Sequence, residues 1–432
     1  MQQDSLSNIF LVLIRLDLKS ADKILRPEFR PISDADQTQL IAGVLDPTQR
    51  VTSTPMSAIP FSKHEKSGYQ GKKNCYNRII KLVQEIQGRF TNYLLKPYKY
   101  TKTAQGEIHE KMGLIGRGMY DLLKSDATKP LQQWLDNILN SNDDRIYRKG
   151  KKDYTSPPHV TIITNDFSIP WYWLKNEQDG AFLCEKCSLG IVQLQGALIQ
   201  NDDDDDDDDE NCDGSIYKAL LINGNKEIPF IEQELNYIKD TLTETDRRSM
   251  GSLVFEPKLV NSADEIGRLV TTCSRSELAK NYNIVHYSGH YSKSEFFVNG
   301  EYFNPDALRG IIKNSLLVLD GCSSLEGLDA WADNISSLTS SLINKGGALG
   351  CVVTPLPIKS DPIVSKIFWG EFYKKIRIGG GFTIGKALHS ARINLRNYFE
   401  SVDSENPSWA FYQLIGRPTI LLGKEKSIDK LD

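Results

Sequence analysis

The stretches NIVHYSGH (residues 283–290) and SLLVLDGC (residues 315–322) decide the fold of this chain. Each is an apolar run that ends in a reactive side chain, His290 in the first and Cys322 in the second. Short, near-continuous apolar runs are typical of strands buried on both faces of a parallel sheet. The 32 positions from His290 to Cys322 leave room for one intervening helix. We therefore expect neighbouring strands that bring an imidazole and a thiol to the same edge of a sheet.

Strands and helices alternate on both sides of these two stretches. The apolar patterns predict strands at 219–224, 251–257 and 348–355, and helices at 228–242, 262–273, 304–312, near 335–346, and at 361–376. Alternation of this kind predicts an α/β layered domain, in which a mostly parallel central sheet is flanked by helices. The sequence shows no repeat with a period of about 20–50 residues, which excludes a solenoid.

The sequence divides into four segments. Residues 1–75 contain the apolar strand NIFLVLIRLDL and many prolines, and we expect a small strand-containing region that regulates the chain or binds a partner. Residues 76–200 carry three helical patterns and then two strands, HVTIITND and FLCEKCSLGIVQLQ. Residues 201–214 hold nine consecutive acids, whose repulsion predicts a disordered loop. Residues 215–424 hold the alternating pattern.

The composition excludes several classes of protein. No apolar run approaches the roughly 18 residues of a membrane span, and the apolar run near the N-terminus lacks the basic lead and cleavage site of a signal peptide. Seven scattered cysteines, an odd number, predict reduced thiols and a cytoplasmic location. The formal net charge of −4 gives no reason to expect nucleic acid as a partner. Without the nine acids of residues 202–210 that charge would be about +5, so one loop carries the acidity.

A thiol beside an imidazole is the arrangement of a nucleophile and its base. A free cysteine with a pKa near about 8.5 is mostly protonated at neutral pH, and a nearby histidine helps to form the thiolate that attacks a carbonyl carbon. Gly289 and Gly321 leave backbone exposed beside the two reactive residues, and their amides are candidate donors to an oxyanion. From chemistry alone, a buried structural role for Cys322 is an equally good interpretation.

Residues from about 80 to 424 resemble the CHAT domain, a bacterial caspase-like family in the same clan as separases, metacaspases and caspases. HYSGH resembles the family's His-x-x-x-His block, whose second histidine corresponds to His290, and LDGCSS resembles its nucleophile block. Four further blocks occur in the expected order: HVTIITNDFSIPWYWL with FLCEKCSLGIVQ, then GGALGCVVTPLP, GFTIGKALHSARINL and WAFYQLIGRP. The chain departs from the family at Tyr291, where glycine is usual, and at Leu356, where tryptophan is common.

The resemblance implies a fold and an activity. The fold is a caspase-like layered domain preceded by a helical pseudo-subunit. The activity is that of a cysteine endopeptidase that cleaves a partner protein through a thioester acyl-enzyme, without cofactor, metal, nucleic acid or membrane. Members of this family are switched on by an activating protein or signal, often in bacterial antiviral defence or programmed cell death. Catalysis is then assigned to His290 and Cys322, and oxyanion binding to Gly289 and Gly321.

Three further residues are candidates for the site. Asp320 shares a strand face with Cys322, and in metacaspase-like relatives an acid at this spacing binds a basic side chain; we expect cleavage after Arg before Lys. A strand-end aspartate that only caps the backbone is an equal alternative. Thr354, in the segment that resembles the following strand, is a second candidate for substrate binding. His286 supports the site or is a buried structural histidine.

Two other motifs give weak signals for metal binding, and two other functions are alternatives to a peptidase. CEKC has the spacing of half a zinc site but no second pair, and the acidic run lacks the spaced ligands of a calcium loop. A catalytically silent CHAT-like scaffold or receptor would keep the fold without the chemistry. A flavodoxin-like or nucleotide-binding domain would need a glycine-rich loop after its first strand, where ALLINGNKEIPF offers only Gly224.

Overall fold

A computed structural model of the full chain places seventeen segments well enough to describe. The described residues are 8–17, 38–45, 57–60, 69–95, 101–140, 157–176, 180–193, 216–225, 228–244, 253–275, 282–292, 295–304, 308–309, 311–322, 339–354, 362–378 and 382–422. The acidic loop predicted at 201–214 lies outside them, as does the departure from the family at Leu356.

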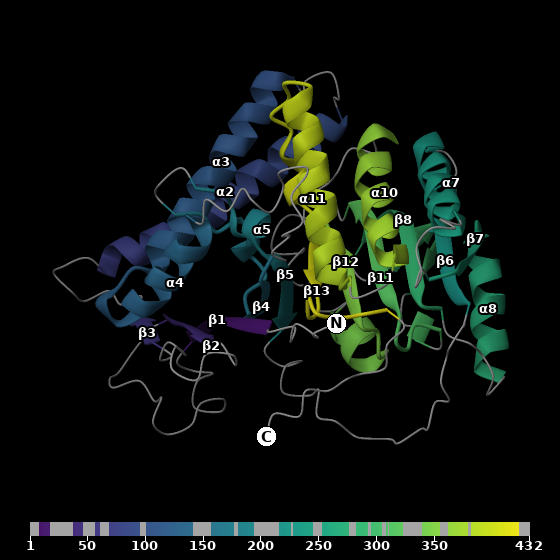
Figure 1. Ribbon diagram of the computed structural model, residues 1–432, viewed down its shortest axis with the longest axis horizontal. Helices are drawn as coiled ribbons and strands as arrows, with labels where there is room; N and C mark the ends of the chain where they lie inside the picture. Colours follow the sequence, from purple (N-terminus) through teal and green to yellow (C-terminus); the bar gives the residue numbers. More distant parts are fainter. Residues whose placement is uncertain are drawn as a thin grey trace.

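The described strands join in one large sheet (Figure 1). In chain order they are β1 (Asn8–Asp17), β2 (Thr38–Leu45), β3 (Ser57–Pro60), β4 (His159–Thr164), β5 (Ser188–Gln193), β6 (Tyr217–Asn223), β7 (Phe255–Val260), β8 (Ile284–Ser292), β9 (Glu295–Val298), β10 (Glu301–Phe303), β11 (Leu316–Cys322), β12 (Gly350–Val353) and β13 (Gln413–Ile415). The pairing in the centre is mostly parallel, as the sequence predicts.

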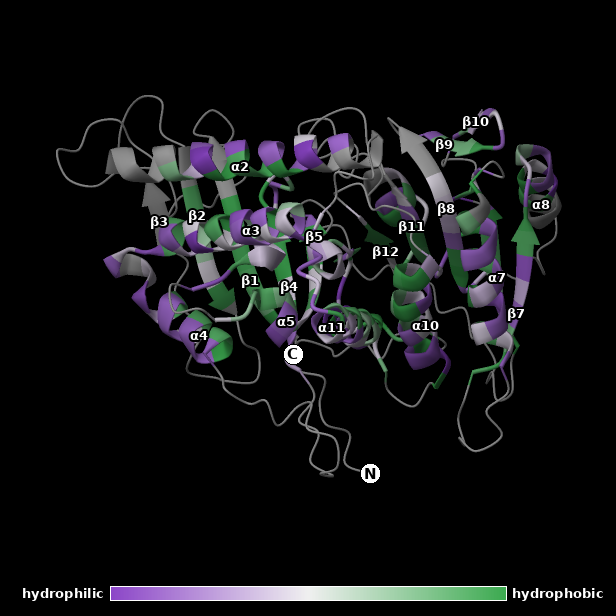
Figure 2. Cartoon of the chain, turned by 90° about the horizontal axis from the view of Figure 1, so that it is seen from above, coloured by the Kyte–Doolittle hydropathy of each residue, from purple (hydrophilic) through white to green (hydrophobic). Residues whose placement is uncertain are grey.

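Helices flank this sheet. They are α2 (Tyr69–Leu95), α3 (Lys102–Leu123), α4 (Lys129–Leu139), α5 (Leu183–Lys186), α7 (Pro229–Thr243), α8 (Ala263–Arg275), α10 (Pro362–Ile378) and α11 (Ile384–Ser401), with short helical turns at Asp126–Thr128, Trp171–Trp173, Thr339–Lys345 and Pro407–Ala410. Helices α7, α10 and α11 lie side by side over one face of the sheet in both views (Figures 1 and 2). The layered α/β architecture predicted from the sequence is therefore confirmed.

The C-terminal half of the sheet has the order β7-β6-β8-β11-β12, with neighbours parallel throughout. Strand order reverses between β6 and β8, and in open sheets of this kind functional groups gather at the carboxyl ends of the strands near such a reversal. The strands are apolar because both faces are covered: Leu316 to Leu319 of β11 are at most 2% exposed. This burial fixes the positions of the residues that follow them.

The N-terminal strands continue the same sheet. β13 pairs antiparallel with β12 and parallel with β5, and β5, β4 and β1 then follow in parallel. β2 adds antiparallel to β1, and β3 adds antiparallel to β2. The strand predicted within residues 1–75 is thus present, and its parallel partner is β4, in the register Asn8 to His159.

The structure differs from the sequence-based expectations in three places. The connection from β8 to β11 contains the hairpin of β9 and β10, whose tight turn uses positive φ angles at Asn299 and Gly300. The first residues of the predicted strand FLCEKCSLGIVQLQ form the short helix α5, with the Glu185 side chain accepting the Phe182 amide. Helix α2 begins at Tyr69, inside the segment 1–75 for which we expected a strand-containing region. Within the described part of the chain, every helix is too short or too polar to cross a membrane.

Candidate active site

The two residues predicted as nucleophile and base stand opposite each other. In the parallel pairing of β11 with β8, Cys322 is in register with His290, Gly321 with Gly289, and Asp320 with Ser288. Cys322 is the last residue of β11. The pairing of β8 with β6 ends at Ser288, so the backbone at His290 lies beyond the reach of β6. The expectation that these strands are neighbours is confirmed at the level of the backbone.

The glycine of the first strand is required by packing. A Cβ atom at Gly289 would lie 2.7 Å from the hydroxyl oxygen of Tyr287 and 2.8 Å from the Cα of Gly224, which follows β6. Real Cβ atoms do not approach backbone atoms so closely. Only glycine therefore fits at this point of β8, where the residue that follows β6 packs against it. The Tyr287 hydroxyl is itself held by donation to the Phe297 carbonyl at 2.8 Å.

Thr354 lies beneath the second glycine. It follows β12, is 1% exposed, and its hydroxyl donates a hydrogen bond of 2.9 Å to the carbonyl oxygen of Gly321. This contact ties the end of β12 to the residue before Cys322. The structure thus gives Thr354 a role in holding the strand end, whereas its predicted contact with substrate stays a prediction.

Asp320 belongs to a cluster of polar side chains under this sheet edge. It is partly buried, and it lies beside Glu234 of α7 and His286 of β8, both fully or almost fully buried. The Nε2 atom of His286 is 3.7 Å from Oε1 of Glu234. One ligand-type atom from each of the three side chains lies within 4.8 Å of the others.

Residues of α10 and β8 surround the cluster. The indole of Trp369 donates a hydrogen bond of 2.8 Å to Oδ2 of Asp320, and its ring meets the His286 ring edge-on at 5.0 Å. The Nδ1 atom of His286 is 2.7 Å from the Tyr373 hydroxyl. The Ser365 hydroxyl donates to Oε2 of Glu234. His286, predicted as a supporting residue, therefore contacts the helix layer and the two carboxyl groups.

Burial dominates the electrostatics of this cluster. It lowers the pKa of His286 to about 4, against a smaller opposing effect of Asp320. Burial and the neighbouring Glu234 raise the pKa of Asp320 to about 8, and burial also raises the pKa of Glu234. Each group thus favours its neutral form, because a charge here has little water to solvate it.

Sequence reasoning missed Glu234. The residue lies on the buried side of α7, between Ile231 and Ile238, which are 3% and 0% exposed. An acid at a helical position where the periodicity expects an apolar residue was the available signal. Nothing in the sequence identified Trp369 and Tyr373 as part of the site either, since aromatic residues on the apolar face of a helix are usually core residues.

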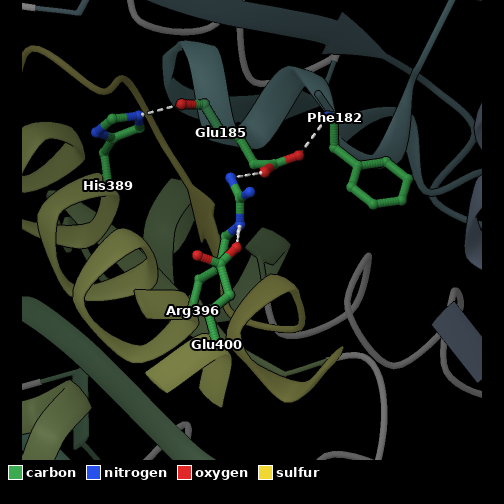
Figure 3. A network of polar contacts seen from close by, with 5 residues as sticks. All are labelled: Phe182, Glu185, His389, Arg396 and Glu400. Atoms are coloured by element: carbon green, nitrogen blue, oxygen red, sulfur yellow. Dashed lines mark hydrogen bonds and ion pairs between the residues drawn. The ribbon is translucent and has the colours of Figure 1, made fainter. Parts of the chain in front are cut away.

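The CEKC motif forms a junction between the two halves of the chain (Figure 3). Glu185 pairs with Arg396 of α11, which also binds Glu400, and the Nε2 atom of His389 lies 2.9 Å from the Glu185 carbonyl oxygen. Cys184 and Cys187 are buried free thiols, and burial raises the pKa of Cys184 to about 12. The network stabilises the contact of α5 with α11.

Comparisons with known proteins add a weak similarity to a solved structure. No protein-family model matches the chain, and no curated protein matches it in sequence. Among solved structures, the chain is similar to the crystal structure of the Arg specific cysteine proteinase gingipain R (RGPB), with a TM-score of 0.37 and 12% sequence identity. That match covers 74% of this chain and 76% of the other. A similarity at this level decides neither the fold nor the activity, and the functional argument depends on the geometry described above.

Proposed function

We propose that this chain is a cysteine endopeptidase with Cys322 as nucleophile and His290 as its base. The observation that supports the proposal is the register of β8 and β11, which sets these two residues opposite each other at the carboxyl edge of the sheet. Neighbouring strands lie about 4.8 Å apart, a spacing at which a thiol and an imidazole can share a hydrogen bond.

The proposed reaction has two stages. His290 takes the proton of the Cys322 thiol, and the thiolate attacks the carbonyl carbon of the scissile peptide bond. Backbone amides at Gly289 and Gly321 are the proposed donors to the resulting oxyanion. The tetrahedral species expels the amine, which takes the proton from His290, and leaves a thioester. Water, deprotonated by His290, then attacks the thioester and releases the carboxylic acid and the thiol.

We assign to Asp320 the selection of substrates with a basic P1 residue. Among the described residues, neither Asp320 nor Glu234 forms an ion pair with a lysine or arginine. An incoming guanidinium would supply the missing positive charge, and its planar fork would satisfy the carboxyl oxygens better than an ammonium. The entering cation would also ionise Asp320, since an opposite charge favours the charged form.

The finer assignment is a CHAT-type peptidase of the cytoplasm that acts on a protein substrate, is switched on by a partner or signal, and serves in defence or cell death. The ordered sequence blocks support the family. Because β1 to β3 continue the sheet that carries the proposed dyad, a partner bound to residues 1–75 would act on the same sheet. The alternative is a catalytically silent scaffold in which His290 and Cys322 are vestigial.

Cleavage of a peptide library tests the proposal. The wild-type chain should cleave and Cys322→Ala should not, while Cys75→Ala should cleave like the wild type. Cys75 is a matched control because it is a partly buried cysteine of the helical region, where its thiol donates to the Gly118 carbonyl at 3.3 Å. Wild-type turnover by Cys322→Ala would overturn the assignment of the nucleophile.

A further inference from the structure

The cluster of Glu234, His286 and Asp320 has the donor set of a metal centre. We propose that these three side chains bind one divalent transition-metal ion. They come from three elements, α7, β8 and β11, and offer two carboxylate oxygens and one imidazole nitrogen within 4.8 Å of one another. An ion held there would fasten α7 to the two strands that end in the proposed dyad.

Each of the three side chains has one polar atom fixed from outside the cluster. Oδ2 of Asp320 accepts the indole N–H of Trp369 at 2.8 Å, and Oε2 of Glu234 accepts the Ser365 hydroxyl. Nδ1 of His286 lies 2.7 Å from the Tyr373 hydroxyl. Metal-binding histidines and carboxylates are oriented by such outer hydrogen bonds, which leave the other atom of each group for the ion.

The inward atoms are buried and poorly satisfied. Oε1 of Glu234 and Nε2 of His286 are out of contact with solvent, and neither has a hydrogen bond of good geometry among the described residues. The Glu234 carboxyl group also interacts with Ser288 and Asp320, and a cation would replace those contacts. His286 is 0% and Glu234 8% exposed. Buried polar atoms are nearly always bonded, because an unsatisfied one costs free energy. A cation between them would satisfy both atoms at once.

The donors indicate the class of ion. Two carboxylates balance the charge of a divalent cation, and an imidazole nitrogen suits zinc and its transition-metal neighbours, whereas calcium and magnesium prefer oxygen ligands throughout. Bond lengths of about 2.0–2.2 Å put the ligands of a tetrahedral zinc roughly 3.3 Å apart. The 3.7 Å between His286 Nε2 and Glu234 Oε1 is close to that spacing, so a small side-chain shift suffices.

This site goes beyond the proposed peptidase activity, and its test does not need that activity. It touches that activity only at Asp320, whose inward oxygen would be taken by the ion and so withheld from a basic P1 side chain. The metal ion and a basic P1 side chain would then compete for Asp320. The metal-free chain would be the form that cleaves after arginine.

The test is zinc binding by the full chain carrying Cys322→Ala, which removes the thiol of the proposed dyad as a competing ligand and needs no activity. Isothermal titration after chelator treatment should give one tight site, and Co²⁺ should give the visible absorption of a tetrahedral N/O site. Glu234→Gln, added to this background, should weaken Zn²⁺ binding at least about 10-fold. Tyr373→Phe, which keeps the ring and removes the anchor of His286, should weaken it about 10–100-fold.

His159→Gln is the matched control, since His159 is another buried strand histidine with an unpartnered Nε2 atom, far from the cluster in β4. It should bind zinc like the parent. Absence of tight zinc binding in the parent would overturn the proposal, as would unchanged binding in both cluster variants, or equal affinity for Ca²⁺ or Mg²⁺. If circular dichroism shows that Glu234→Gln does not fold, Tyr373→Phe alone decides.

Discussion

Cys322 is opposite His290 in the parallel pairing of β11 with β8, and the backbone that precedes both residues is a glycine pair, Gly321 with Gly289. The apolar residues below them are buried on both faces of the sheet, so the register cannot slip by one residue without exposing that surface. The same burial that fixes the strands therefore fixes the relative position of the proposed nucleophile and base.

His290→Ala and His286→Ala should fail in different ways. Loss of the proposed base should lower kcat by about 10²–10⁴-fold with little change in the free energy of unfolding. His286→Ala should retain more turnover but should unfold more easily, because it removes the partner of Tyr373 and leaves a buried gap. Steady-state kinetics and urea denaturation of both variants separate the two roles, and the reverse ranking in kcat would move the base to His286.

Gly289→Ala should destabilise the sheet edge. Its Cβ would lie 2.8 Å from the Gly224 Cα, and backbone cannot yield as a flexible side chain would. Gly267→Ala on α8 is the matched control, since nothing lies within 4 Å of its Cβ position and alanine favours a helix by roughly 0.5–1 kcal/mol. Thermal melts should show a lower Tm for the first variant and an equal or higher Tm for the second. Equal melts for Gly289→Ala and wild type would refute the packing argument.

Asp320→Ala should remove any preference for arginine at P1. The proposed selection depends on Asp320 in a desolvated setting, where a guanidinium ionises the carboxyl group and pairs with it, whereas a neutral P1 residue gains no such contact. Chelator-treated enzyme and fluorogenic peptides that differ only at P1 give the measurement as ratios of kcat/KM. A wild-type preference for Asp, Leu or Met, or an unchanged Arg preference in the variant, would contradict this assignment.

The pH dependence of stability should carry a contribution from His389. Burial lowers its pKa from 6.5 to about 4 in the folded chain, opposed by the hydrogen bond to the Glu185 carbonyl. The unfolded chain therefore takes up the proton first, so stability present above pH 6.5 is lost as the pH falls toward 4. The loss amounts to roughly 3 kcal/mol at the acid end.

His389→Gln keeps a donor to the carbonyl and removes the titration. Urea unfolding at pH 7 and pH 4.5 should show a smaller fall in the free energy of unfolding for the variant than for wild type. Parallel pH profiles would mean that His389 does not titrate between the two states.

The parts of the fold that could be predicted are those with strong local periodicity. Apolar runs predict the strands β6, β8, β11 and β12, because both faces of these strands are buried. Helical spacing predicts α7, α10 and α11, because one face of each helix is buried. The backbone placement of His290 and Cys322 at one edge follows from the same pattern, since parallel strands end together.

The remaining features depend on partners distant in sequence. The β9–β10 hairpin, with its turn at Asn299 and Gly300, lies in a connection for which the sequence predicted only the helix at 304–312. Helix α5 replaces the start of a predicted strand because Glu185 caps it and pairs with Arg396, 211 positions away. Glu234 looked like one more charge on an amphipathic helix. Only the packing of α7 against β8 brings it to His286 and Asp320.

The measurement that tests the central claim most directly is covalent labelling of Cys322. The chain is incubated with a peptide carrying a thiol-directed warhead, and intact mass followed by peptide mapping locates the adduct. We predict one adduct per chain on Cys322, formed rapidly in wild type, much more slowly in His290→Ala, and absent in Cys322→Ala. No adduct on Cys322, or a rate in His290→Ala equal to that of wild type, would contradict a Cys322–His290 dyad.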